Sequence, residues 1–453
     1  MRIEDARPYY ERFFQQFPTA GRYWKFYAEH EMKFGHFDRT EAIFRKCLNN
    51  CLNVELWKSY LTYIETRKNI NPISIQNMSE NLVNQADLDE LIRAYRYACD
   101  HVGRDVNSTD IWRNLIRYMK CKKSSQQYNV SFDQQNKLKN IRDIYQQILT
   151  IPMNELSAIW HEYEQFENEY AKQTAKQKLA ESHPQYQLAL KKFKEKKNIR
   201  DGLLLNMLAR PPSGLEKEEQ QKKIWKTLIA FEKRNTQRLS MEDVRQRVLF
   251  TYEQALLCLY HYPEIWYEAA MYLASYSAHK ETSRMFERAI KALPDNILIH
   301  FAYADYEETK NNFEKASKIY DKLMQHRQDA IVVIQYLKFL RRRFGVEQAR
   351  DLFLKAIRGN CSYHIYVAYA LMEFQVNGQP DIAVKVFEKG LANPNNMHEP
   401  AYILQYLKLL EHMNDRNNTR VLFKKVLATM PKEKSLEIWN KYLEFEYGEG
   451  DPN

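Results

Sequence analysis

Apolar and polar residues alternate along the chain with the spacing of helices, and aromatic residues hold the apolar positions. In the stretch 24–31, Trp24, Tyr27 and Glu31 fall at i, i+3 and i+7, on one face of a helix. A second amphipathic helix is predicted just before it, and Phe17-Pro18 ends that helix. The pattern therefore predicts a unit of two helices, A followed by B, joined by a short turn.

The same unit recurs along the chain, and one B-helix position, which we call the anchor position, recurs with it. The anchor position is held by Trp24, Trp57, Trp112, Trp160, Trp225, Trp266 and Trp439, and by His300, Val333, Tyr366 and Tyr402 where Trp is missing. From residue 266 onward the anchor positions are spaced by 34, 33, 33, 36 and 37 residues, the period of a two-helix solenoid repeat. The sequence therefore predicts an all-α protein, an α-solenoid of about eleven helical hairpins.

The spacing also divides the chain into two parts. Inserts at 71–89 and 121–135 and an extended basic A helix at 184–207 stretch the early units, whereas the units become regular after residue 238. We therefore predict an N-terminal domain at 1–237 with about five repeats, and a C-terminal domain at 238–453 with about six.

Recurring residues in the B helices are predicted to build the core. A large aromatic side chain buries on the order of 150 to 250 Å² and keeps an N–H or O–H that needs a partner. A buried carboxylate is tolerated when it is paired. We therefore expect the Glu seven residues after the anchor position to accept such a bond, or to bond an Arg or Tyr of a neighbouring A helix. These residues are Glu31, Glu167, Glu232, Glu307, Glu373 and Glu446.

The amino-acid composition supports a helical fold and indicates the cellular compartment. Gly and Pro number only 11 and 14, too few for a fold of many strands and turns. The six Cys residues are widely scattered, which fits a reducing compartment. No stretch approaches the roughly 18 apolar residues of a membrane span, so no membrane partner is expected. These features indicate the cytosol or the nucleus.

No pattern of catalytic residues was found. The chain contains no Gly-rich phosphate loop, Gly-x-Ser-x-Gly or Cys-x-x-Cys sequence. Cys47 and Cys51 lie at i and i+4, but no His follows with metal-ligand spacing, so buried thiols are the interpretation. We therefore expect no enzyme activity, no metal and no cofactor.

Much of the formal net charge of +10 is concentrated in one stretch. Residues 171–200 contain nine Lys or Arg against two Glu. A basic stretch here could contact RNA phosphates or an acidic partner, or it could be a solvated helix face, and the two interpretations are equally supported. Aromatic residues that would stack on bases are not interleaved with it. The candidate contact residues are Lys191, Lys192, Lys194, Lys196, Lys197 and Arg200.

The recurring pattern resembles the half-a-tetratricopeptide (HAT) repeat of RNA-processing scaffolds. It consists of Trp-x-x-Tyr-x-x-x-Glu after an aromatic-Glu-Arg sequence, as in Tyr10-Glu11-Arg12. Longer stretches resemble the HAT-repeat scaffold subunits of cleavage stimulation factor, of 77 kDa in animals. HAT repeats alone would also fit splicing scaffolds of the crooked-neck type. The longer stretches are Phe17-Pro-Thr-Ala-Gly-Arg-Tyr-Trp-Lys-Phe-Tyr, His261-Tyr-Pro-Glu-Ile-Trp-Tyr-Glu-Ala-Ala, Phe301-Ala-Tyr-Ala-Asp-Tyr-Glu-Glu, Gln335-Tyr-Leu-Lys-Phe and Asn417-Asn-Thr-Arg-Val-Leu-Phe.

This resemblance implies a nuclear, non-catalytic scaffold of pre-mRNA 3′-end cleavage and polyadenylation. It implies a homodimer formed by the C-terminal HAT domain, with an interface that we expect within 381–453. The implied partners are the RNA-recognition-motif and WD-repeat subunits of cleavage stimulation factor, the cleavage and polyadenylation specificity factor, and pre-mRNA if the basic stretch contacts it. Family members carry a Pro-rich tail that captures partner subunits. The chain ends at Asp451-Pro-Asn, so binding through such a tail is not expected of these residues.

Overall fold

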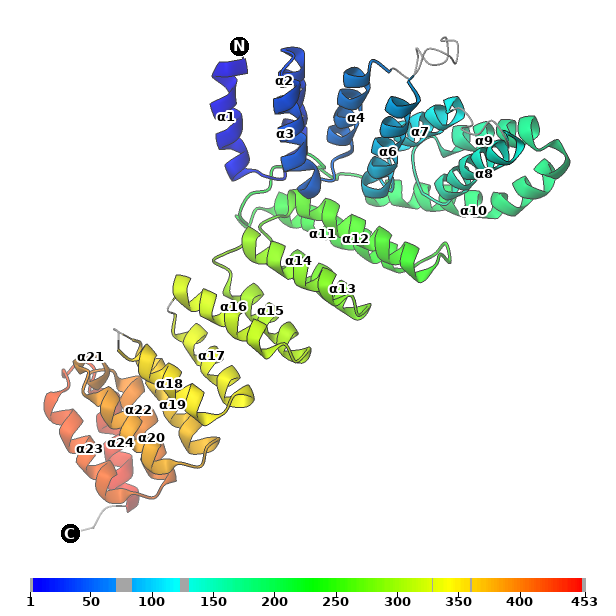
Figure 1. Ribbon diagram of the computed structural model, residues 1–453. Helices are drawn as coiled ribbons and strands as arrows, with labels where there is room; N and C mark the ends of the chain where they lie inside the picture. The colour runs from blue at the N-terminus through cyan, green and yellow to red at the C-terminus, as the bar shows by residue number, and fades with distance from the viewer. Residues whose placement is uncertain (1–2, 71–83, 123–129, 328, 359–360, 450–453) are drawn as a thin grey trace. The chain divides into compact units, whose positions relative to one another are not determined.

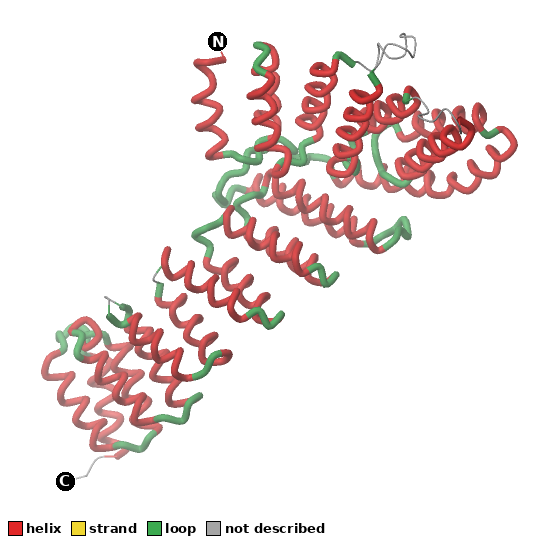
Figure 2. The backbone as a smooth tube through the Cα atoms, viewed as in Figure 1, coloured by secondary structure: helices red, strands yellow, loops and turns green. Residues whose placement is uncertain are grey.

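The structure is a computed structural model that describes residues 3–70, 84–122, 130–327, 329–358 and 361–449. These residues form helices joined by turns and loops, and none of the described residues lies in a strand (Figure 2). The all-α prediction is confirmed. No helix among these residues is long and apolar enough to cross a membrane.

The chain divides into two compact units, Met1–Leu293 and Pro294–Asn453. The helices of the first unit (Figure 1) are α1 (Ile3–Gln16), α2 (Gly21–Lys33), α3 (Phe37–Cys47), the short 3-10 helix η1 (Leu48–Asn50), α4 (Val54–Lys68), α6 (Gln85–Val102), α7 (Thr109–Cys121), α8 (Val130–Leu149), α9 (Leu156–Tyr170), α10 (Lys172–Ile199), α11 (Glu216–Lys233), α12 (Met241–Cys258), α13 (Pro263–Ser275) and α14 (His279–Ala292).

The second unit continues the same alternation of helices. Its helices are α15 (Ile297–Thr309), α16 (Phe313–His326), α17 (Ala330–Arg343), α18 (Val346–Ala356), α19 (Tyr363–Gln375), α20 (Pro380–Leu391), the single-turn α21 (Pro394–Met397), α22 (Pro400–His412), α23 (Arg416–Thr429) and α24 (Leu436–Glu449). Taken in chain order and without η1 and α21, the helices of the described residues form eleven successive A and B pairs. The predicted number of repeats is confirmed. The domain boundary near residue 238 stays a prediction, because the division at Leu293 follows contact density and not repeat spacing.

Local sequence explains where the helices begin and end. Asn53 and Asn296 cap α4 and α15, each accepting a hydrogen bond at 3.1 Å from the backbone N–H three residues later. Pro263 occupies the first turn of α13, where its missing N–H costs nothing. Asn69 ends α4 in the left-handed conformation at φ 53°, which Asn tolerates better than most residues.

The fifth A helix differs from the prediction. We placed it at 184–207, but α10 begins at Lys172 and ends at Ile199, with Pro184 inside it. The residues before Pro184 are mostly strong helix formers, and they continue the helix through the proline. Most of the two predicted inserts, at 71–83 and 123–129, lies outside the described residues, as does the chain end at 450–453.

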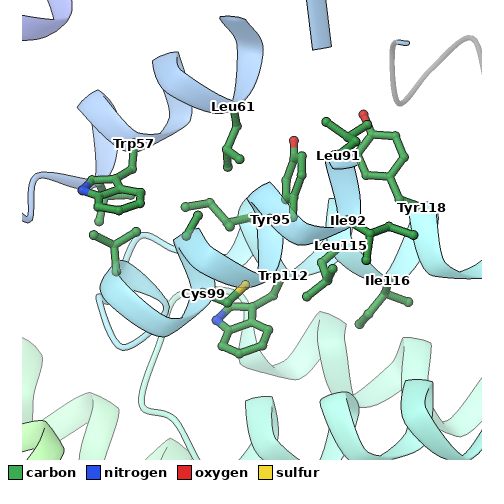
Figure 3. Close-up of a cluster of buried hydrophobic side chains, with 14 of the residues drawn as sticks. Trp57, Leu61, Leu91, Ile92, Tyr95, Cys99, Trp112, Leu115, Ile116 and Tyr118 are labelled. Carbon is green, nitrogen blue, oxygen red and sulfur yellow. The ribbon is translucent and has the colours of Figure 1, made fainter. Parts of the chain in front are cut away.

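Stacking of successive repeats creates a continuous core in the first unit. Figure 3 shows part of it, where Trp57 of α4, Tyr95 of α6 and Trp112 of α7 lie among buried aliphatic side chains. Each of these three rings is nearly inaccessible to solvent. A single hairpin could not enclose them, so each repeat depends on its neighbours for its core.

Candidate functional site

The structure places most anchor positions in the core. Trp24, Trp57, Trp112, Trp225 and Trp266 are buried, and so are the four residues that replace Trp in the second unit. Trp160 is half-buried, with its ring stacked on Tyr186 at 4.7 Å between centroids. Trp439 departs from the prediction, because 46% of it is exposed.

Buried indole N–H groups are satisfied by the turn that precedes the B helix. Trp24, Trp57 and Trp266 donate to the carbonyl oxygen six residues earlier, at 2.9, 3.0 and 2.8 Å. Trp112 reaches back nine residues to Gly103 at 2.9 Å. Each bond fixes the turn against its own B helix and removes the cost of a buried, unpaired donor.

A second recurring contact joins the two helices of a repeat. The aromatic residue of the A helix meets the Tyr three residues after the anchor position. Ring centroids lie 4.5 Å apart in Tyr10–Tyr27, 5.5 Å in Tyr145–Tyr163, 5.0 Å in Tyr320–Tyr336, 4.0 Å in Phe353–Tyr369 and 4.8 Å in Phe423–Tyr442. The spacing is that of favourable aromatic pairs.

The predicted Glu pairs with a cation in all six repeats. The pairs are Arg7–Glu31, Arg142–Glu167, Lys192–Glu232 with Lys196–Glu232, Lys315–Glu307, Arg350–Glu373 and Arg420–Glu446, at 2.5 to 3.0 Å. In four repeats the cation is an Arg three residues before the A-helix aromatic. The expectation of a bond between helices is confirmed, and Arg-x-x-Tyr or Arg-x-x-Phe is the sequence signal that would have named the donor.

Glu373 shows how such a carboxylate is held inside the core. It accepts two bonds from Arg350, one from Tyr369 at 2.5 Å and one from Asn377 at 2.8 Å. Burial alone would raise the pKa of Glu373, but these bonds outweigh it and hold the pKa below its usual value. The carboxylate is therefore charged and paired inside the core, where it ties α18 to α19.

The basic stretch does not lie on one surface. Lys191, Lys194 and Lys197 of α10 are exposed, and Arg200 is half-buried at its end. Lys192 and Lys196 instead point into the protein and are only 2% and 8% exposed. The prediction that all six residues contact a partner was wrong for Lys192 and Lys196. The run of charges extends over both faces of α10, and α11 packs against one of these faces.

Glu232 of α11 explains why two lysines are buried. Its carboxylate lies 2.8 Å from Lys192 Nζ and 3.0 Å from Lys196 Nζ, and it is itself only 2% exposed. Burial by itself would raise the pKa of Glu232, but the charges of Lys196 and Lys192 lower it to about 2. Arg247 of α12 lies near this group and donates to the Thr150 carbonyl at 2.6 Å. The two ion pairs thus join α10 to α11.

The last repeat exposes an apolar face, which we call the terminal stripe. It consists of Leu436, Trp439, Leu443 and Tyr447, spaced along one face of α24 and 68%, 46%, 51% and 90% exposed. Phe423 of α23 covers the other side of α24 through Tyr442 and Phe445. Trp439 is thus an anchor residue whose outer side has no following repeat among the described residues.

The cysteines of the described residues are free thiols, and four of them are buried. No group of three or more His, Cys, Asp or Glu side chains there is arranged to hold a metal ion. Cys47 and Cys51 are buried, and burial raises the pKa of the Cys47 thiol to about 12. Such thiols are protonated at neutral pH and unreactive.

Helical hairpins with these recurring contacts define the chain as a repeat protein, an α-solenoid of the HAT type. A crystal structure of CstF-77 has this fold. It matches with a TM-score of 0.58 over 95% of this chain and 85% of its own, at 19% sequence identity. Residues 1–453 match the Suf family, described as Suppressor of forked protein, and the chain belongs to this family.

Three curated relatives match almost the whole chain. Cleavage stimulation factor subunit 77 of Arabidopsis thaliana is 36% identical over 99% of this chain and 59% of its own length. Protein suppressor of forked of Drosophila melanogaster is 32% identical over 99% of this chain and 63% of its own length. The mRNA 3′-end-processing protein rna14 of Schizosaccharomyces pombe is 28% identical over 99% and 65%. The chain thus spans less than two thirds of the length of these relatives.

Proposed function

We propose that the chain is a homodimeric, non-catalytic scaffold of pre-mRNA 3′-end cleavage and polyadenylation, acting in the nucleus. The names of the relatives, a subunit of cleavage stimulation factor and an mRNA 3′-end-processing protein, support this process over the spliceosomal alternative. The proposed partners are the RNA-recognition-motif and WD-repeat subunits of that factor and the cleavage and polyadenylation specificity factor. A solenoid offers long surfaces on which such subunits could be held together.

The exposed terminal stripe is the main support for a homodimer. Four large apolar side chains on one face of α24 are more exposed than a monomer in water favours, and such patches mark interaction surfaces. They lie within 381–453, where we expect the interface. An intimate dimer buries about 2,000 Å² or more, so residues outside the stripe must contribute to it.

Light scattering coupled to size-exclusion chromatography tests the dimer. We expect a mass of twice 54.4 kDa that does not change on dilution through the micromolar range. The variant Trp439→Ser with Leu443→Ser should lower the mass toward that of one chain. The control Glu437→Ser with Glu444→Ser changes exposed polar residues of the same helix that lie about 100° around the helix from the centre of the stripe, and it should leave the dimer intact.

A stable monomer of the unchanged chain would remove the homodimer from the proposal. A dimer that persists in the stripe variant would place the interface elsewhere. Purification of the native complex, followed by mass spectrometry, tests the partners. Absence of 3′-end-processing subunits from that complex would contradict the scaffold role.

Direct RNA binding is a second candidate, and the exposed lysines of α10 favour it. Lys191, Lys194 and Lys197 recur every three residues and leave one side of the helix positively charged. Changing these three to Glu should abolish any RNA binding that weakens with salt. Lys192 and Lys196 should be left unchanged in that variant, since their replacement would disturb the core. Failure of the unchanged chain to bind RNA at low salt would end this candidate.

A further inference from the structure

A groove of about 390 Å³ opens between α1, α2 and α3, and we call it the N-terminal groove. Its floor consists of the buried Phe14, Trp24, Tyr27 and Ile43. The rings of Phe14 and Trp24 lie 3.4 Å apart between centroids and within 8° of parallel. The Trp24 indole is also bonded to the Pro18 carbonyl. The floor is therefore apolar and held in place from below.

Exposed cations line one wall of the N-terminal groove. Arg39 and Lys46 lie on α3 seven residues apart, so they are about 10 Å apart along the helix axis. Ala42 lies between them and is exposed, and its small side chain leaves space between the two cations. Lys46 Nζ lies 6.0 Å from the centroid of the Trp24 ring. Glu11 of α1 lines the groove as well.

Arg39 and Lys46 do not belong to the recurring pairs between a cation and a buried Glu. Neither Arg39 nor Lys46 forms an ion pair with any residue that the structure describes. Lys315 occupies the position of Arg39 in a later repeat, and it lies 3.0 Å from the buried Glu307. The N-terminal groove thus combines an apolar floor with two uncompensated positive charges and one negative charge, which favours an acidic ligand.

We propose that the N-terminal groove binds a short acidic peptide segment of a partner protein. One aliphatic or aromatic side chain of the peptide lies over Ala42 and Ile43, and two carboxylates pair with Arg39 and Lys46. An extended peptide advances about 3.3 Å per residue, so carboxylates three residues apart match the spacing of the two cations. The groove volume suits two or three side chains.

RNA fits this groove less well than a peptide does. Bases bind to proteins by stacking on exposed aromatic faces. Here the rings of Phe14 and Trp24 stack on each other and are buried. The net positive charge therefore points to carboxylates on a protein segment.

Fluorescence anisotropy with the full 453-residue chain tests this proposal. The probes are labelled twelve-residue peptides in which two Glu residues, three apart, flank Leu or Phe. Versions with Gln in place of Glu and a twelve-nucleotide oligouridine serve as comparison. We expect the Glu peptides to bind, and the Gln versions to bind at least about tenfold more weakly.

Variants locate the binding. Arg39→Glu with Lys46→Glu should weaken peptide binding at least about tenfold, and Ala42→Trp should block it without a change of charge. Arg12→Glu with Lys33→Glu makes the same charge change at exposed positions that do not line the groove, and should leave binding unchanged. Circular dichroism checks that each variant is folded. Equal binding of Glu and Gln peptides, equal loss in both double variants, or loss of oligouridine binding alone would overturn the proposal.

Discussion

Replacing Glu232 with Gln removes the carboxylate that Lys192 and Lys196 share in the core. Both lysines would then be buried close together without a counter-charge. Removal of one partner from a buried ion pair typically costs about 3 to 5 kcal/mol, because the remaining charge stays out of water. We therefore expect Glu232→Gln to be strongly destabilising to the hairpin of α10 and α11.

The pKa of Glu232 gives a second measure of the same interaction. A shift from 4.5 to about 2 corresponds to roughly 3 kcal/mol in favour of the charged form. Because the pKa is lower in the folded state, this stabilisation is fully present above pH 4.5. It is lost as the pH falls from 4.5 toward 2, since the carboxylate then takes up a proton. The difference between the two proteins should shrink over that range.

Hydrogen exchange followed by mass spectrometry measures the change where it occurs. Solenoids can open one repeat at a time, so a global melting curve would blend several transitions. At pH 7, peptides from α10 and α11 should exchange about 100-fold faster in Glu232→Gln, the rate equivalent of about 3 kcal/mol. Glu216→Gln, an exposed change on α11, should leave exchange unaltered.

Two results would refute this reasoning. Exchange in α10 and α11 that stays within about threefold of the unchanged chain would show that the ion pairs contribute little stability, as surface pairs do. A difference in protection of α10 and α11 between the two proteins that is as large at pH 3 as at pH 7 would show that the carboxylate charge is not the cause.

Three further substitutions test the core. Trp266→Ala should cost about 3 to 5 kcal/mol, measured by urea unfolding, and a change under 1 kcal/mol would show that the anchor position is not core. Trp439→Ala should cost less in the isolated chain, under about 2 kcal/mol by the same measurement, because nearly half of the residue is exposed. Glu65 accepts hydrogen bonds from Tyr95 and Tyr118 at 2.5 and 2.7 Å. Glu65→Leu should therefore be destabilising by about 2 kcal/mol or more. Glu65→Gln keeps a hydrogen-bond acceptor and should be milder. Equal melting temperatures of these two variants would contradict this explanation.

Much of the fold could be predicted because one residue type marks one position. Trp is large and needs both burial and a hydrogen-bond acceptor, so its spacing reveals the repeat even where inserts intervene. The limits of α10 could not be predicted from Pro184, because a proline inside a helix leaves the same local signal as a proline that begins one.

Surface sites were harder to predict than the core. Lys192 and Lys196 look like their neighbours in the sequence, and only the partner Glu232, on a different helix, shows that they are buried. Trp439 has the same sequence pattern as the buried anchor residues, and its exposure of 46% shows only in the structure. The N-terminal groove likewise is lined by residues of three helices, and no single sequence motif predicts it.

An insertion between the two helices of a repeat would separate the anchor indole from the carbonyl that it bonds. The fifth repeat illustrates this, because residues 200–215 join its helices and the N–H of Trp225 has no partner among the described residues. An insertion between repeats leaves the bond intact, and the long sequence inserts at 71–89 and 121–135 both follow a B helix. Length variation in this family should therefore accumulate between repeats, where new loops can evolve without loss of the core.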